Sequence, residues 1–404
     1  KFGSLEKPES PAPDPDLGAI TSGRGVITKT HYEKEASETS VSIEVIRPYK
    51  WRPDDSAKSL RDTKLRIATD IIDNRLSELA KKEGAPFTGG GSYAQEFLDF
   101  AQFGSIYVTC EPDQWEGALE VAEQEIRRAL SHGFTKSEFD EVIAKIRNGF
   151  EQQVRSSASR QSRPLADGLV SSISRGNVFS SPQQDLEWFE KNVASINPEN
   201  CLEELRKVWD IEDRQIFIGG NLDLPNADKR ILDVYGKSLK VEVEPPVEEE
   251  TAEFAYTEFG EKGEIIERKD VYDLGVVQLR FANNVRVNLK RTDFAKDSIS
   301  LAVRIGGGLL TAPKDKPGLH VVASSMLNGG GLEAHSADDL RRIFAGKTVG
   351  SQFAIDEDSF TFAGATNQKD MLDAMRLIAA FVSAPGYREE ALRQLHNNID
   401  PLYT

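Results

Sequence analysis

Residues 103–150 read FGSIYVTCEPDQWEGALEVAEQEIRRALSHGFTKSEFDEVIAKIRNGF. The alternating start predicts a strand over Phe103–Cys110, and Pro112 then opens a helix that Gly133 ends. Thr135 and Glu138 form a capping box, so a second helix follows, with apolar residues at helical spacing. The stretch therefore predicts a strand, a helix, a turn and another helix, which is a unit of a mixed α/β domain.

This unit occurs twice in the chain. An offset of 253 residues pairs apolar with apolar positions through both helices: Leu119 with Leu372, Ala122 with Met375, Ile126 with Ala379, Ala129 with Val382, and the helix-ending Gly133 with Gly386. After a one-residue shift the strands also pair: Ile106 with Phe360, and Val108 with Phe362. Chance is the alternative, because this order of elements is common. One offset that holds through two helices favours an internal repeat.

The rest of the chain supplies further elements. Periodicity predicts helices over 55–82, 198–209, 318–328, 336–345, 368–383 and 388–399. Alternation predicts strands over 41–46, 215–219, 298–305, 348–355 and 359–364, and a hairpin of 276–281 with 285–289 around Asn283 and Asn284. Strands and helices are mixed in both halves, which predicts an α+β fold with two mixed α/β domains.

Two segments break this pattern. Residues 8–18 hold four prolines in eleven positions, which is typical of an extended linker. Residues 241–264 combine an acid run with prolines, Gly260 and Gly263, which is typical of a second, solvated linker.

Composition excludes several classes of protein. The 404 residues hold 50 Lys and Arg against 66 Asp and Glu, and the net charge of −16 disfavours nucleic-acid binding. No run approaches the roughly 18 consecutive apolar residues of a membrane span. The two cysteines are too few for a disulfide scaffold or a thiolate zinc finger. We therefore expect no nucleic-acid partner and no membrane span.

Few residues form a pattern typical of metal binding, phosphate binding or catalysis. None of the five histidines lies three or four positions from another, so no helix carries a two-histidine metal face. The glycine triplets at 306–308 and 329–331 do not continue into a phosphate-binding loop. Neither cysteine has a nearby histidine, and no Gly-x-Ser-x-Gly occurs. The residues alone indicate no active site, although a small-molecule enzyme that uses the glycine-rich loops stays as a minor alternative.

Several motifs, taken in order, carry a family resemblance. They are Lys1-Phe-Gly-Ser-Leu-Glu-Lys-Pro, Gly104-Ser-Ile-Tyr-Val-Thr-Cys-Glu-Pro, Gly133-Phe-Thr-Lys-Ser-Glu-Phe-Asp-Glu-Val, Asn284-Val-Arg-Val-Asn-Leu-Lys-Arg-Thr-Asp, Val303-Arg-Ile-Gly-Gly-Gly and Gly331-Leu-Glu-Ala-His-Ser-Ala-Asp-Asp-Leu-Arg-Arg. With this order and spacing, nearly the whole chain resembles the insulinase/pitrilysin family. These inverzincin zinc metallopeptidases are built from repeated α/β roll domains, each a mixed sheet with helices packed on it.

The resemblance implies a chemistry whose residues this chain lacks. The family binds zinc through His-x-x-Glu-His in its first domain, and the motif glutamate is the general base. The resemblance places that domain upstream of Lys1. In the matching helix of the third domain, Val321, Ser324 and Ser325 occupy the positions of the His, Glu and His. We therefore expect zinc in the parent protein, but no catalytic residue and no metal ligand in this chain.

The same resemblance implies an organisation and a function. Residues 1–20 would be the tail of an upstream domain and a linker, 21–240 a second α/β roll domain, 241–264 the acidic linker, and 265–404 an incomplete, degenerate third domain. The expected function is the non-catalytic portion of a zinc-dependent metalloendopeptidase that encloses and hydrolyses peptides. This portion would contribute chamber wall and substrate binding.

The expected partners are a peptide substrate and the remaining domains of the parent chain, in the periplasm or cell envelope. The alternative function is a peptide-binding scaffold or an inactive partner subunit of the same fold.

Overall fold

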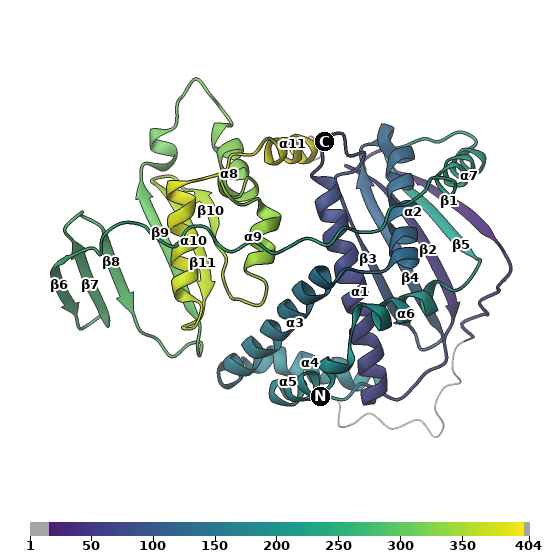
Figure 1. Cartoon of the computed structure of the whole chain (residues 1–404), viewed down its shortest axis with the longest axis horizontal. Coiled ribbons are helices and arrows are strands. Elements are labelled where there is room, and N and C mark those ends of the chain that lie inside the picture. The colour runs from purple at the N-terminus through teal and green to yellow at the C-terminus, as the bar shows by residue number, and fades with distance from the viewer. Residues whose placement is uncertain (1–15, 400–404) are drawn as a thin grey trace, which may run out of the picture.

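The computed structural model describes residues 16–399 and contains two α/β bodies joined by an extended segment (Figure 1). The predicted tail over 1–20 and the proline-rich linker over 8–18 therefore lie largely outside the described residues. No helix within 16–399 combines the length and the apolar character that crossing a membrane requires.

The first domain is built on a five-stranded sheet with the order β1-β5-β2-β4-β3. All neighbours are antiparallel except β1 and β5. The strands β2 and β4 lie at its centre, where Val41 pairs with Val108 and Ile43 with Ile106, and all four side chains are buried. The strands are β1 Val26–Tyr32, β2 Thr39–Pro48, β3 Gly89–Phe97, β4 Ala101–Cys110 and β5 Arg214–Gly220.

Seven helices complete the first domain among the described residues. Asp55 caps the long α1, and Gly133, with φ +74°, ends α2. The predicted capping box is present: Thr135 accepts a hydrogen bond from the backbone N–H of Glu138, whose carboxylate accepts one from that of Thr135. The helices are α1 Ser56–Ala80, α2 Trp115–His132, α3 Lys136–Ser156, α4 Ser162–Arg175, α5 Pro182–Asn192, α6 Pro198–Trp209 and α7 Ala227–Ser238.

The second domain holds two smaller sheets, with strand orders β10-β11-β9 and β6-β7-β8. The predicted hairpin is β7 with β8, and Asn284 has φ 69° at its turn. Phe353, Phe362 and Phe381 pack in a core separate from that of the first domain. The elements are β6 Ile265–Val271, β7 Val276–Phe281, β8 Arg286–Lys290, β9 Ile299–Gly306, α8 Leu319–Gly329, α9 Ala337–Ile343, β10 Gln352–Ile355, β11 Ser359–Thr366, α10 Met371–Ser383 and α11 Glu389–Ile399.

The two domains repeat one topology, as the sequence predicts. In each, a central strand (β4 or β11) lies between two antiparallel neighbours and is followed by two consecutive helices. Val108 and Phe362, paired by the sequence, are both buried in these central strands. The predicted α+β fold is therefore confirmed, with a mixed sheet in the first domain and antiparallel sheets in the second.

The helix pairing needs a correction. Leu119, Ala122 and Ala129 are buried in α2, whereas their predicted counterparts in α10 are exposed: Leu372, Met375 and Val382. A pairing two residues further along matches buried with buried residues: Leu119 with Ala374, Ala122 with Leu377, Ile126 with Phe381, and Ala129 with Ala384. The physical reason is that side chains two positions apart on a helix point in different directions, so the pairing has to match the buried faces of the two helices.

Residues 241–264 are extended, but part of the predicted solvated linker is bound to the protein. The Glu248 carboxylate accepts hydrogen bonds from the backbone N–H groups of Lys136 and Ser137, at 3.0 and 2.8 Å, where it stabilises the N-terminus of α3. Glu249 forms an ion pair with Arg342 at 2.6 Å. Residues 257–264, by contrast, are all exposed.

Ion pairs also connect the two domains directly. Arg341 and Arg342 of α9 bind the Glu78 carboxylate of α1 at 2.7 and 2.5 Å, and Arg341 also pairs with Glu141 of α3. Lys81 of α1 pairs with Asp338. The domains thus contact each other through side chains as well as through the linker.

His335 gives the linker a predicted pH dependence. Its Nε2 accepts a hydrogen bond from the backbone N–H of Ala255 at 2.9 Å, which requires an unprotonated nitrogen. Burial lowers the pKa of His335; Asp339 opposes this shift and Arg388 adds to it. Because the folded pKa lies below the unfolded value of about 6.5, this contact weakens as pH falls below that value.

We therefore expect limited proteolysis within 251–264 to be faster at about pH 5 than at about pH 7.5, relative to an unstructured reference peptide. His335→Phe should remove the pH dependence. Equal relative rates at the two pH values in the unsubstituted chain would contradict this role of His335.

Candidate functional site

Helix α8 carries the three positions that the family resemblance predicts for the zinc motif. Val321 is exposed, and Ser324 and Ser325 are half-buried, on a helix that contacts α11 and β10. An isopropyl group and two hydroxyls do not supply the imidazole, thiolate or carboxylate donors that zinc uses in proteins. These residues do not fit a zinc ion, and no catalytic step is assigned to them.

Other metal-binding and nucleophilic groups are also engaged or inert. Among residues 16–399, no three His, Cys, Asp or Glu side chains come together in a way that could hold a metal ion. Cys110 and Cys201 are buried free thiols, and burial raises the pKa of each to about 12. A thiol with that pKa is a poor nucleophile at neutral pH.

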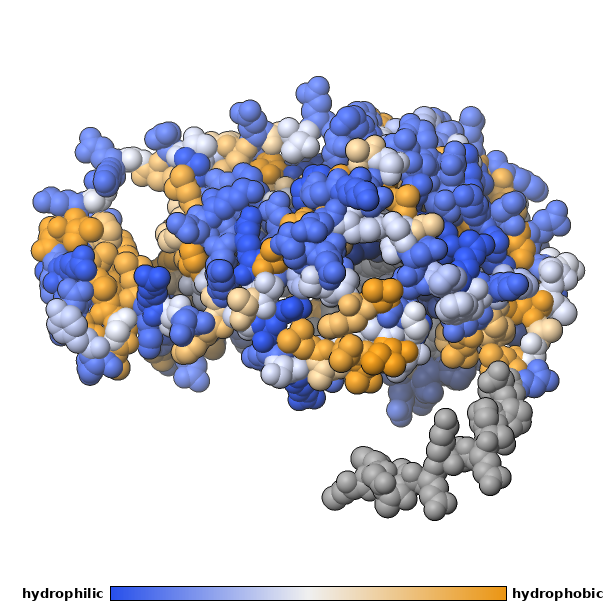
Figure 2. All heavy atoms as spheres, turned by 90° about the horizontal axis from the view of Figure 1, so that it is seen from below, coloured by the Kyte–Doolittle hydropathy of each residue, from blue (hydrophilic) through white to orange (hydrophobic). Residues whose placement is uncertain are grey.

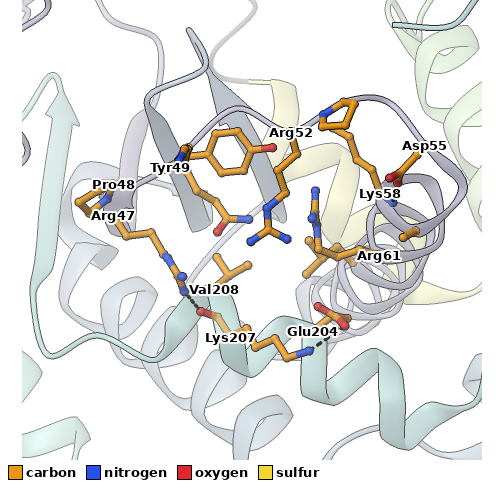
Figure 3. A pocket seen from close by; sticks show the side chains of 15 residues that line it. Arg47, Pro48, Tyr49, Arg52, Asp55, Lys58, Arg61, Glu204, Lys207 and Val208 are labelled. Carbon is orange, nitrogen blue, oxygen red and sulfur yellow. Dashed lines mark hydrogen bonds and ion pairs between the residues drawn. The ribbon is translucent and has the colours of Figure 1, made fainter.

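The most distinctive cavity is a pocket of about 730 Å³ at the end of β2, which we call the basic pocket (Figure 3). The end of β2, the loop over 49–55, the start of α1 and the last turns of α6 form its walls. Six of its lining residues are cations and two are carboxylates, Asp55 and Glu204, so a chain with net charge −16 carries a local excess of positive charge here. The cations are Arg47, Lys50, Arg52, Lys58, Arg61 and Lys207.

Three of these cations already have carboxylate partners. Lys58 pairs with Asp62 at 2.7 Å, and Arg61 with Glu96 at 2.9 Å. Lys207 pairs with Glu204 at 2.9 Å.

The other three cations are Arg47, Lys50 and Arg52. The Arg47 guanidinium donates to the main-chain carbonyl of Lys207, which holds the side chain across the pocket without neutralising it. Within residues 16–399, none of the three has an ion-pair partner. In Figure 3 the Arg52 guanidinium points into the pocket toward that of Arg61. The free positive charge is therefore concentrated on the loop side of the pocket.

The remaining lining is apolar or weakly polar. Leu65 and Val208 are buried and form part of the wall. Burial raises the pKa of Tyr49, and the negative charge of Glu96 adds to the shift, so the phenol stays neutral. The pocket can thus contact an anion with its cations and an apolar group with its walls.

An exposed apolar surface adjoins the basic pocket. It consists of Trp51 with Ile173, Val178 and Phe179 from α4 and the segment after it, and we call it the α4 patch. Trp51, Ile173 and Val178 are 51%, 71% and 67% exposed. The backbone N–H of Val178 donates to the Asp54 carboxylate at 2.7 Å, which ties the segment to the pocket loop. Figure 2 shows an orange, apolar area on the face seen from below, in the region where α4 lies in Figure 1.

Sequence reasoning missed this pocket, although part of it was visible. Residues 47–52, Arg-Pro-Tyr-Lys-Trp-Arg, hold three cations and no carboxylate in a strongly acidic chain. That local reversal of charge is a signal for an anion-binding loop. Lys207 is distant in sequence, and only the fold brings it to the pocket.

Comparisons with known proteins agree with the fold. A family model described as the Peptidase M16 inactive domain matches residues 2–146. Over 96% of the chain, the fold matches the periplasmic protease PqqL from Escherichia coli, with a TM-score of 0.52 and 16% identity. Over 96% it also matches the ferredoxin protease FusC, solved as a mutant in complex with Arabidopsis ferredoxin, with a TM-score of 0.58 and 15% identity.

Pitrilysin matches over 98% of the chain with a TM-score of 0.51 and 14% identity. No curated protein sequence matches the chain. The chain spans less than half of the three solved proteins: 43%, 44% and 41% of their lengths.

The fold is that of insulinase-like proteases, as the sequence motifs predict. Residues 2–146 match the inactive domain of M16 peptidases, and the chain shares its fold with PqqL and pitrilysin. The matched domain is of the type that these proteases carry as a non-catalytic part.

Proposed function

We propose that this chain is the non-catalytic portion of a zinc-dependent metalloendopeptidase and contributes chamber wall and peptide binding. The observation that carries the proposal is the M16 inactive-domain match over residues 2–146. The donor set on α8 supports it, because Val321, Ser324 and Ser325 cannot replace zinc ligands. Zinc and the general base would belong to a catalytic domain of the parent protein.

The domain arrangement suits a wall that holds a peptide. The ion pairs of Arg341 and Arg342 with Glu78 hold the two domains against each other. β3 lies at one edge of the five-stranded sheet and pairs on one side only, with β4. An edge strand offers unpaired backbone groups, so an extended peptide can be held there by strand addition. We also propose a periplasmic location, which the likeness to a periplasmic protease supports.

A peptide-binding scaffold that never cleaves is the second candidate. The absence of zinc ligands at Val321, Ser324 and Ser325 is equally compatible with it. The two candidates share peptide binding and differ in whether the full-length protein hydrolyses what this chain binds.

Peptide binding without cleavage tests the shared part of the proposal. The 404-residue chain should bind unfolded peptides from a mixed library in a pull-down, and mass spectrometry should recover those peptides intact. Failure to retain any peptide above the level seen with a heat-denatured sample would refute the role in substrate binding.

A further inference from the structure

We propose that the basic pocket and the α4 patch together bind an acidic peptide segment, with its carboxylates on Arg47, Lys50 and Arg52 and its apolar side chains on the patch. This inference deepens the proposed function and rests on it for the peptide nature of the ligand. It names acidic, partly apolar peptides as the class that this surface selects.

Charge is the first reason. Arg47, Lys50 and Arg52 face the same cavity, and no carboxylate within residues 16–399 pairs with any of them. Arg52 also points into the cavity toward Arg61 (Figure 3), and only Arg61 is paired, with Glu96, so the charge of Arg52 is left for an anion. A guanidinium binds a carboxylate in a two-pronged geometry, which gives direction as well as attraction.

The shape of the pocket is the second reason. A volume of about 730 Å³ is larger than a single carboxylate requires and lies within the usual range for ligand pockets. Buried Leu65 and Val208 give it an apolar wall beside the cations. The space therefore suits side chains of a chain segment better than a small inorganic anion.

The α4 patch is the third reason. None of the residues of α4 is buried, and its apolar residues Leu169, Val170 and Ile173 are exposed. Trp51 connects the patch to the pocket, because it lies in sequence between Lys50 and Arg52. A ligand that covers both surfaces must carry negative charge and apolar groups close together, which an acidic peptide does.

The basic pocket suits a phosphate ligand less well than an acidic peptide. Asp55 already caps the N-terminus of α1 at the pocket, where its carboxylate accepts from the backbone N–H of Lys58 at 2.8 Å. The lining residues contain no glycine, so no glycine-rich loop offers converging backbone N–H groups to a phosphate. The experiment must therefore distinguish phosphate binding from binding of the acidic peptide.

The experiment measures fluorescence anisotropy of a labelled peptide that contains several Glu residues flanked by Leu and Phe. The matched peptide has Gln in place of each Glu. The 404-residue chain should bind the Glu peptide roughly tenfold more tightly at low salt, and the difference should shrink at high salt. Binding of the Glu peptide should also change the fluorescence of Trp51.

Substitutions in the basic pocket test whether the Glu peptide binds there. The double substitution Lys50→Ala with Arg52→Ala should weaken binding of the Glu peptide roughly tenfold. The control, Lys314→Ala with Lys316→Ala, removes the same charge from two exposed positions of the second domain and should leave binding unchanged. Circular dichroism of each variant checks that it is folded.

Equal binding of the Glu and Gln peptides would overturn the proposal, as would an unchanged affinity in the Lys50 and Arg52 variant. Tight binding of inorganic pyrophosphate without binding of the Glu peptide would overturn it in favour of a phosphate site. The assay needs neither zinc nor hydrolysis. A full-length protein without peptidase activity would refute the proposed enzyme while leaving this binding result intact.

Discussion

Replacement of Arg75 by methionine is expected to lower the free energy of unfolding of the first domain by about 3–5 kcal/mol. Arg75 is buried between α1, α2 and α3, and its guanidinium binds Glu138 through two nitrogens, at 2.5 and 2.8 Å. It also donates to Glu125 at 3.3 Å and to the carbonyl oxygen of Gly133 at 2.9 Å. Methionine keeps the volume but leaves these acceptors without their donor.

The loss of stability on replacing Arg75 is large because Glu125 is only 1% exposed and would lose one of its two arginine partners. Burial raises the pKa of Glu125, against the opposing charges of Arg75 and Arg128. Burial would also raise the pKa of Glu138, but hydrogen bonds from Arg75 and Thr135 lower it overall. Arg75 therefore opposes the effect of burial on the pKa of both carboxylates.

The sign of the pH dependence follows from these shifts. In the variant, Glu125 has an even higher folded pKa, so it takes up a proton and the penalty falls as pH decreases from neutral. In the unsubstituted chain, the stabilisation from Glu138 is lost as pH falls through its lowered pKa. The loss from Glu138 falls below about pH 5, because its pKa lies below the ordinary value of 4.5. Uptake of a proton by Glu125 should therefore make the difference between variant and unsubstituted chain smaller at about pH 5 than at pH 7.

Tryptophan fluorescence during urea denaturation measures this effect, because all four tryptophans lie in the first domain: Trp51, Trp115, Trp188 and Trp209. Arg66→Met on the same helix is the control. Its weak ion pair with Asp70, at 3.8 Å, is exposed, so the change should stay within about 0.5 kcal/mol. A loss below about 1 kcal/mol for Arg75→Met would show that Arg75 does not support the buried carboxylates.

Replacement of Ile106 by alanine is expected to cost about 2–5 kcal/mol in the same measurement. Ile106 is fully buried in β4, the second strand from one edge of the five-stranded sheet, where it pairs with Ile43 of β2 and Ser92 of β3. The truncation removes apolar contacts and leaves a cavity between the sheet and its helices.

The neighbouring Tyr107 provides the control for Ile106. Its side chain points to the opposite face of the sheet, is partly exposed and lies against Tyr93 at a ring separation of 6.5 Å. Tyr107→Ala should therefore cost about 1 kcal/mol or less. Equal losses at positions 106 and 107 would contradict the assignment of the two sheet faces.

The strongly patterned elements could be predicted from the sequence. The capping box of Thr135 and Glu138 and the glycine that ends α2 are local signals, and both are present. β4 and the repeated order of elements followed from alternation and self-similarity. These features depend on neighbours in the chain, so the sequence contains what is needed to find them.

The sequence patterns did not predict β1, β3 or α4. β1 lies at the sheet edge and takes its place only by parallel pairing with β5, almost 200 residues away. β3 begins with three glycines, which predict no strand, yet Gly90 lies so close to the carbonyl oxygen of Tyr107 that a side chain there would clash. α4 has an amphipathic pattern but no buried residue, so its apolar face does not mark a core.

Some features of the candidate site could likewise be predicted from the sequence, and others could not. Resemblance alone can suggest positions for the lost zinc motif, because the proposed residues, Val321, Ser324 and Ser325, lie in one helix. The basic pocket could not be predicted, since Lys207 and the loop around Lys50 meet only after α6 packs against α1. The net charge of −16 describes the whole chain and does not reveal a pocket with a local excess of positive charge.

Zinc content and peptidase activity, measured side by side on the 404-residue chain and on the full-length natural protein, test the central claim most directly. A quenched peptide reports cleavage, and a chelator provides the control. The account predicts that only the full-length protein binds about one zinc and cleaves. Chelator-sensitive cleavage by the 404-residue chain alone, with zinc bound, would contradict it.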